Sequence, residues 1–310
     1  MLETAAYEQI HCMLDCLAVA VNQRGVESRP LYFGVWDGPF EITEQAEIRY
    51  YSPRLSFDNG MMEKLYGSRI TKVGHYETFN YEVFSSLIGG KGQDTTYIFR
   101  MNLFHLPYAK QYRVQHRPHL VVVDHASGEG SYIVDPYFGW EGYIANDVIR
   151  EALYWEGHIL GYELNAQSIK EPSLKTIAAA FEESMLSGTR LADEVMGLVS
   201  GETEDTLPDL SARVQQIGVL TKRNYGYGIA CSYFEEALGT FHRSFHDHVH
   251  ELVKGWETVV LLCTKASILR RMDFLAKMAD KIRQLQLLEL QIKDQLGQIY
   301  SSWRDKQGIQ

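Results

Sequence analysis

Residues 7–25 read YEQIHCMLDCLAVAVNQRG, and the N-terminal half of the chain is organised around this stretch. Apolar residues recur at helical spacing after Cys12 and predict a helix with one buried face: Leu14, Leu17, Ala18 and Val21. Gly25 stands where a C-terminal cap is expected. A thiol at a helix N-terminus faces the positive end of the helix dipole, which favours the reactive thiolate. The pattern therefore indicates Cys12, preceded by His11, as a nucleophile.

Cys16 is the alternative nucleophile, because it lies one helical turn after Cys12. Leu17, Ala18 and Val19 follow it directly. A free cysteine among small apolar residues is usually part of a core. We therefore interpret Cys16 as structural, and the choice of Cys12 depends on partners elsewhere in the chain.

A second informative stretch, residues 116–144, reads HRPHLVVVDHASGEGSYIVDPYFGWEGYI. Its β-rich runs flank the turn-forming sequence ASGEG and predict a hairpin. His119 opens the first strand and Asp135 closes the second, so these two ends should be neighbours. Asp135 can then hold one ring nitrogen of His119 and leave the other for a thiol. Of the competing histidines, His105 and His116 lie before the hairpin and lack a carboxylate at its matching end, and His125 sits beside the turn. Cys12, His119 and Asp135 are therefore the predicted catalytic residues.

The composition restricts the classes of function. The chain has 310 residues and 45% hydrophobic content, enough for two ordinary domains or one large one. Its net charge of -10 argues against a general nucleic-acid binder and is compatible with a cationic substrate. The four cysteines form no CxxC pair, which indicates a reduced, cytoplasmic protein. No secretory signal and no membrane-spanning segment is apparent, so no membrane association is expected.

Composition changes near residue 165, and helical patterns dominate from there on. We therefore predict an α+β protein with a catalytic domain over residues 1–165, built on an antiparallel sheet, and a helical domain over residues 166–310. The aromatic segment 28–42 is interpreted as a packing loop or a substrate wall, and NYGYG at 224–228 as a connection between helices. Residues 268–310 predict a long amphipathic helix, which packs within its domain or forms a homodimer.

A run of histidines near residue 245 suggests metal binding. His242, His246 and His250 repeat every four residues and would share one helix face. Zinc normally recruits further ligands from elsewhere, and the chain has no HExxH pattern. A polar helix face is the favoured interpretation, so no metal site is predicted.

The helix-borne cysteine, followed by His and Asp on antiparallel strands, resembles the papain-like cysteine fold. HCMLDCLAVAVNQRG, at residues 11–25, resembles the N-terminal signature of the butirosin-biosynthesis acyltransferase family, and FGVWDGPFEI resembles the segment that follows it there. The HLVVVD and YIVDP strands match the family's His and Asp elements. The resemblance covers roughly residues 7–145. It implies Cys12 as nucleophile, His119 as general base and acid, and Asp135 as the residue that orients His119.

The same resemblance implies the reaction class. In that family the acyl group comes from a carrier protein's phosphopantetheine thioester and the acceptor is an amine, so no other cofactor is expected. The whole chain more closely resembles the acyltransferases of petrobactin-type siderophore assembly. Those are associated with joining a carrier-bound 3,4-dihydroxybenzoyl group to spermidine, which implies an aryl carrier protein and a polyamine as partners. The alternatives are a cysteine hydrolase of amides or thioesters and a non-catalytic helical interaction protein.

Overall fold

The chain folds into two compact units. The computed structural model describes residues 7, 9–50, 60–73, 80–92, 94–153, 159–186 and 188–309. We call residues 11–31 and 59–173 the sheet unit, and residues 1–10, 32–58 and 174–310 the helical unit. The expected α+β class is confirmed, because an antiparallel sheet region is followed by mostly helical chain. The division differs from the expected boundary at 165/166, since two early segments belong to the helical unit.

A six-stranded antiparallel sheet forms the centre of the sheet unit. Its strands are β3 (Ile70–Val73), β4 (Thr95–Asn102), β5 (Pro118–Ala126), β6 (Gly130–Asp135), β7 (Trp140–Ala145) and β8 (Gly161–Asn165). They lie in the order β3-β8-β4-β5-β6-β7, and every neighbouring pair is antiparallel. The predicted hairpin is thus present as β5 and β6, with a register shift between Val123 and His125.

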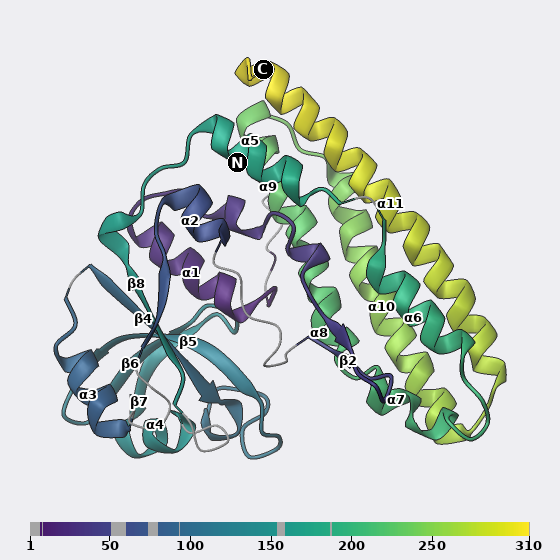
Figure 1. Ribbon diagram of the computed structural model, residues 1–310, viewed down its shortest axis with the longest axis horizontal. Helices are drawn as coiled ribbons and strands as arrows, with labels where there is room; N and C mark the ends of the chain where they lie inside the picture. Colours follow the sequence, from purple (N-terminus) through teal and green to yellow (C-terminus); the bar gives the residue numbers. More distant parts are fainter. Residues whose placement is uncertain are drawn as a thin grey trace. The chain divides into compact units, whose positions relative to one another are not determined.

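Among its described residues, the sheet unit has four helices: α1 (Cys12–Gln23), α2 (Gly60–Tyr66), α3 (Tyr81–Gly89) and α4 (Asn146–Leu153). α3 and α4 pack on the central strands and share a core with them that includes Phe84, Phe99 and Ile149. α1 packs against β5. Figure 1 draws α1 on one side of the sheet and both α3 and α4 on the opposite side.

Helix α1 forms where the sequence predicts it and ends at the predicted glycine. Leu17 and Val21 are fully buried, and burying each such side chain contributes roughly 1.5–3 kcal/mol. Gly25 has φ of 70° and donates to the carbonyl of Asn22, while Val26 donates to that of Val21. This pair of bonds closes the helix in the left-handed arrangement that favours glycine. The cap fixes the length of the helix that carries Cys12.

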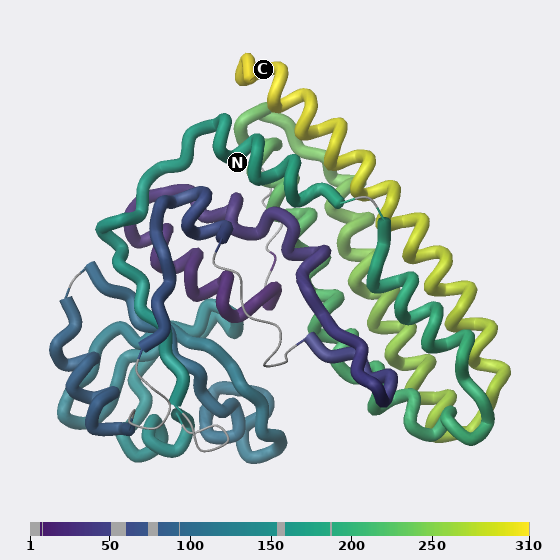
Figure 2. Tube along the Cα trace, in the orientation of Figure 1, coloured from purple at the N-terminus to yellow at the C-terminus, as the bar shows by residue number. Residues whose placement is uncertain are grey.

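Seven helices and a two-stranded ribbon make up the helical unit within the described residues. The helices are α5 (Leu174–Ser184), α6 (Arg190–Ser200), α7 (Leu210–Arg213), α8 (Ile217–Leu220), α9 (Tyr225–Leu238), α10 (Arg243–Leu269) and α11 (Asp273–Gln307), and the ribbon joins β1 (Glu41–Ile42) to β2 (Ile48–Arg49). The two units also contain short 3-10 turns, which are η1 (Arg29–Tyr32), η2 (Val35–Asp37), η3 (Leu103–His105), η4 (Ala166–Ser168), η5 (Leu207–Asp209) and η6 (Thr221–Asn224). Figure 2 shows α10 and α11 running side by side.

Aromatic packing explains why residues 32–58 belong to the helical unit. Phe33 lies edge-on to Phe181, with ring centroids 5.3 Å apart. Trp36 stacks on Tyr227 of α9, with centroids 4.4 Å apart. Aromatic pairs at such distances add to the free energy gained by burying their area. Of the two interpretations for this segment, these contacts support the packing loop.

The NYGYG sequence is helical, which corrects the expected loop. Tyr225 begins α9, and both glycines lie inside it. A Cβ at Gly226 would come within 2.3 Å of a methyl carbon of Val35, and one at Gly228 within 2.1 Å of the Tyr7 ring. The glycines therefore allow two other segments to approach the helix closely, and packing there offsets their low helix propensity.

The long C-terminal helix is present, but it begins at Asp273. Arg270, with φ of 51°, separates it from α10. Its apolar stripe is buried against α6, α9 and α10 and includes Met278, Ile282, Leu285 and Leu296. The homodimer through this helix stays a prediction. Across the described residues, no helix combines the length and the apolar character needed to cross a membrane.

Candidate active site

The start of α1 is capped by the residue that precedes the predicted nucleophile. His11 has extended backbone angles, and its Nδ1 accepts a hydrogen bond from the Leu14 N–H at 3.4 Å. The Asp15 carboxylate accepts from the backbone N–H of His11, also at 3.4 Å. This reciprocal pair satisfies helix donors in the manner of a capping box. His11 therefore supports the helix end on which Cys12 stands.

Cys12 differs from the other cysteines in exposure. All four lie among the described residues, and Cys12 alone is partly exposed while Cys16, Cys231 and Cys263 are buried. The Cys16 thiol donates to the carbonyl of Leu120 at 3.4 Å, and burial raises its pKa well above the usual range. A buried thiol that holds its proton is a poor nucleophile, so the structural interpretation of Cys16 fits its position.

His119 and Asp135 meet on one face of the sheet. Val122 pairs with Val134, so Asp135 lies opposite Val121, and His119 is two residues further along the same face. Nε2 of His119 lies 3.0 and 2.9 Å from the two carboxylate oxygens of Asp135. Both side chains are buried, with 5% and 0% of their surface exposed. The register of the hairpin therefore produces the predicted pairing.

Cys12 completes the arrangement from α1. Its side chain lies close enough to His119 to raise the pKa of that ring. Because Nε2 of His119 is engaged by Asp135, Nδ1 is the ring nitrogen left for the sulfur. The structure thus brings together all three residues predicted from the sequence. A thiol, an imidazole and a carboxylate in this order can activate a nucleophile and then protonate a leaving group.

The charge balance around His119 favours its protonated form. Burial opposes protonation of the ring, but hydrogen bonds to Asp135 and Cys12, together with the charges of both, raise the pKa of His119 to about 10. An imidazolium next to a thiol stabilises the thiolate.

Tyr108 is a site residue that sequence reasoning missed. Its hydroxyl donates to Oδ2 of Asp135 at 2.8 Å, and the backbone N–H of Phe138 donates to Oδ1 at 3.3 Å. The Tyr108 ring stacks on Trp140 with ring centroids 3.9 Å apart. Burial and the negative charge of Asp135 raise the pKa of Tyr108, so its hydroxyl stays a donor. These contacts hold the carboxylate in place while it faces His119.

The competing histidines of the sheet unit have other partners. Nδ1 of His105 lies 3.1 Å from Glu151, and Nδ1 of His116 lies 2.9 Å from the Asn102 amide. His125 contacts Tyr143 and Asp124 near the turn of the hairpin. None of these contacts involves the carboxylate of Asp135. The choice of His119 from its strand position agrees with its placement.

The histidine run occupies the start of α10, in the helical unit. His246 is buried, and its Nε2 lies 2.9 Å from Glu235 of α9. Nδ1 of His242 lies 3.0 Å from the same carboxylate, while His250 stacks against the Tyr7 ring. His242 and His246 thus meet at Glu235 while His250 packs against Tyr7, and His246 belongs to a separate buried cluster.

Comparison with known proteins places the chain in a family. The model of the DUF6005 N-terminal domain matches residues 8–169, and that of the DUF6005 C-terminal domain matches residues 175–310. The chain is also similar to the petrobactin synthase of Bacillus anthracis, with 27% identity over 313 residues that cover 96% of each chain. This similarity confirms the resemblance to proteins of petrobactin-type siderophore assembly that the sequence indicated. The chain therefore belongs to the DUF6005 family.

Proposed function

We propose that this protein is a cysteine-dependent acyltransferase of petrobactin-type siderophore biosynthesis. It would move an acyl group from a carrier protein's phosphopantetheine thioester to an amine, through an acyl-Cys12 intermediate. The observation that carries the proposal is the placement of His119, which hydrogen-bonds to Asp135 and whose pKa is raised by the nearby side chain of Cys12. The same arrangement argues against a purely non-catalytic helical interaction protein, because Cys12 is partly exposed and paired.

The first step transfers the acyl group to the protein. The thiolate of Cys12 attacks the thioester carbonyl carbon, forming a new carbon–sulfur bond, and the bond to phosphopantetheine breaks. The departing thiolate takes the proton of the His119 imidazolium, which leaves neutral His119. N–H groups at the start of a helix have no intrahelical partner, so the backbone N–H of Cys12 can stabilise the oxyanion.

The second step transfers the acyl group to the amine. The nitrogen attacks the carbonyl carbon of acyl-Cys12, the carbon–nitrogen bond forms, and the bond to Cys12 breaks. Neutral His119 accepts the proton of the attacking amine, which restores the thiolate–imidazolium pair. Asp135, held by Tyr108, keeps the imidazole oriented through both steps. The thioester supplies the activation, so the proposed cycle includes no nucleotide.

The proposed substrates are a 3,4-dihydroxybenzoyl group on an aryl carrier protein and spermidine or a spermidine conjugate. The support for these substrates is the resemblance of the chain to acyltransferases of petrobactin-type siderophore assembly, together with its similarity, over 96% of each chain, to a protein named petrobactin synthase. The net charge of -10 is compatible with a polycationic acceptor.

Intact-mass spectrometry tests the covalent step. The wild-type protein is mixed with a carrier protein that bears 3,4-dihydroxybenzoyl-phosphopantetheine, and the acyl mass is followed by peptide mapping. We expect one acyl group on Cys12, none on Cys12→Ala, and normal acylation of the matched control Cys263→Ala. Acylation of Cys12→Ala, or of another cysteine in the wild type, would overturn the assignment.

Adding acceptors separates transfer from hydrolysis. We expect spermidine to discharge acyl-Cys12 faster than buffer alone and to yield an amide. Release of the free acid at the same rate with and without spermidine or simpler amines would establish a thioester hydrolase instead.

A further inference from the structure

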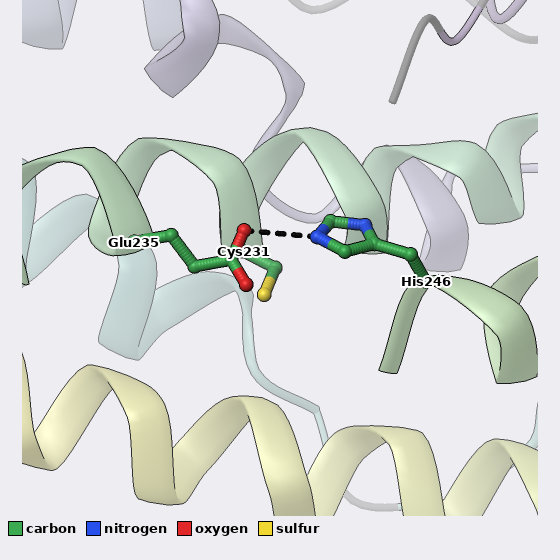
Figure 3. Close-up of side chains that lie close together, drawn as sticks. All are labelled: Cys231, Glu235 and His246. Atoms are coloured by element: carbon green, nitrogen blue, oxygen red, sulfur yellow. Dashed lines mark hydrogen bonds and ion pairs between the residues drawn. The ribbon is translucent and has the colours of Figure 1, made fainter. Parts of the chain in front are cut away.

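A second group of a cysteine, a histidine and a carboxylate is buried in the helical unit. Cys231 and Glu235 lie one turn apart on α9, and His246 faces them from the start of α10. Figure 3 shows the three side chains pointing toward one another. One donor atom of each lies within 4.8 Å of the other two, and all three residues are buried. The proposed acyl transfer uses none of them.

Two of the three donors, His246 and Glu235, are also held from behind. The Tyr7 hydroxyl lies 2.6 Å from Nδ1 of His246, on the ring edge that points away from Glu235. Oε1 of Glu235 accepts from Nδ1 of His242 at 3.0 Å, while Oε2 faces His246. Metal-binding histidines and carboxylates usually have such outer partners, which fix the orientation of the ligand atoms.

We propose that Cys231, Glu235 and His246 form a zinc site. A thiolate, an imidazole nitrogen and a carboxylate oxygen are the three kinds of protein ligand that Zn²⁺ takes. This mixture of a soft and two harder donors favours Zn²⁺ over Mg²⁺ or Ca²⁺, which prefer oxygen ligands. A water molecule would complete a tetrahedral shell, as it does in zinc sites with three protein ligands.

The proton balance of binding follows from the contacts. Burial and the nearby charge of Glu235 raise the pKa of the Cys231 thiol, so the metal-free protein carries a proton there that Zn²⁺ displaces into solvent. Burial alone would raise the pKa of Glu235, but hydrogen bonds from His246 and His242 lower it, so the carboxylate is already ionised. Nε2 of His246 must be unprotonated to bind, and Tyr7 can then accept a hydrogen bond from Nδ1.

The site would join two consecutive helices to a segment that is distant in the sequence. Cys231 and Glu235 belong to α9, His246 to α10, and Tyr7 to the segment that precedes the nucleophile helix. A metal ion that binds only the folded form stabilises it by mass action. We therefore assign the site a structural role in holding α9 against α10.

Metal analysis of the full-length protein tests the site. Cys12 and His119 can themselves hold zinc, so the measurements are made on Cys12→Ala. After removal of metal by a chelator, the protein is dialysed against limiting Zn²⁺, and its zinc content and melting temperature are recorded. We expect about one zinc per chain and a rise in melting temperature. Further substitution of Cys231→Ala or His246→Ala should abolish both effects, whereas the matched controls Cys263→Ala and His248→Ala should retain them.

Cobalt gives a readout that leaves the cluster intact. A protein carrying Cys12→Ala and Cys263→Ala, loaded with Co²⁺, should show the thiolate-to-cobalt absorption of a cysteine ligand. The absorption should disappear when one equivalent of Zn²⁺ is added. Absence of that band, or zinc uptake that persists when Cys231 and His246 are both replaced, would show that the cluster is only a hydrogen-bond network.

Discussion

The two units each bury a histidine between a thiol and a carboxylate, yet the two arrangements differ in geometry. In the sheet unit, His119 lies between Cys12 and Asp135, and the thiol is partly exposed at a helix start. In the helical unit, Cys231 lies in the middle of α9, and its sulfur lies within 4.8 Å of ligand atoms of Glu235 and His246. A relay ending in an accessible sulfur suits a nucleophile, whereas three mutually close buried donors suit a metal ion. The same side-chain chemistry therefore has different uses, set by exposure and by which atoms meet.

Replacing the imidazole of the sheet unit should have the largest effect. His119→Ala removes the group that protonates the leaving thiol and deprotonates the amine, so we expect amide formation to slow by roughly 10²–10⁴-fold. The measurement is the rate of amide formation from an acylated carrier protein and spermidine. The matched variant His105→Ala should form the amide at a rate within about threefold of wild type, because substitutions away from the catalytic residues usually have little effect. Equal losses in the rate of amide formation in both variants would show that His119 has no catalytic role that His105 lacks.

The corresponding change in the helical unit should affect stability. Glu235→Gln places an amide where the carboxylate accepts from His246 and His242, and we expect a loss of about 1–3 kcal/mol in the free energy of unfolding. Urea denaturation in the presence of a chelator measures this effect without metal. The neighbouring exposed residue provides a control, and Glu236→Gln should change stability by no more than about 0.5 kcal/mol. A Glu235→Gln protein as stable as Glu236→Gln would mean that the network contributes nothing.

Tyr108→Phe tests how firmly Asp135 must be held. The variant keeps the stack on Trp140 and loses the hydroxyl that donates to the carboxylate. We expect kcat to fall by about tenfold, since a hydrogen bond to a charged group is worth about 1.5–3 kcal/mol. The change should appear in kcat and in its pH profile, with KM little altered, because Tyr108 acts through Asp135. Tyr112→Phe, in the same segment, is the control and should behave as wild type.

The smallest expected effect is the contribution of His119 to the pH dependence of the free energy of unfolding. Its pKa is raised in the folded protein, so its stabilising contribution is complete below the unfolded value of about 6.5 and is lost as pH rises through the folded value. Cys12→Ser removes the Cys12 contribution to the raised pKa of His119 and keeps the contribution of Asp135. We expect the unfolding free energy of Cys12→Ser to fall from pH 6.5 upward.

Subtracting a second variant isolates the contribution of His119. The fall with pH should be absent from the protein carrying both Cys12→Ser and His119→Gln, as measured by urea denaturation at several pH values. If the unfolding free energies of the two proteins changed with pH in the same way, the titrating group would be one other than His119.

Local sequence was sufficient for the elements that carry the predicted trio. Helix α1 follows from its apolar spacing and from Gly25, and the hairpin follows from two β-rich runs around a turn. Because side chains alternate along strands, the hairpin register by itself sets His119 and Asp135 on one face. These features depend on neighbours within about 20 residues, which is the range over which periodicity and caps act.

Tertiary structure alone decided the features that depend on distant partners. NYGYG became helical because Val35 and Tyr7 pack closely against its glycines. Tyr108 reached Asp135 across the fold, and nothing in its local sequence marks that role.

The cysteine of α9 shows the same limit. Cys231 reads as an ordinary core residue until α10 brings His246 beside it. The sequence by itself determined short-range geometry, because propensity and hydrogen bonding act between near neighbours. The close approach of remote side chains depended on how the helices pack, which no local pattern encodes.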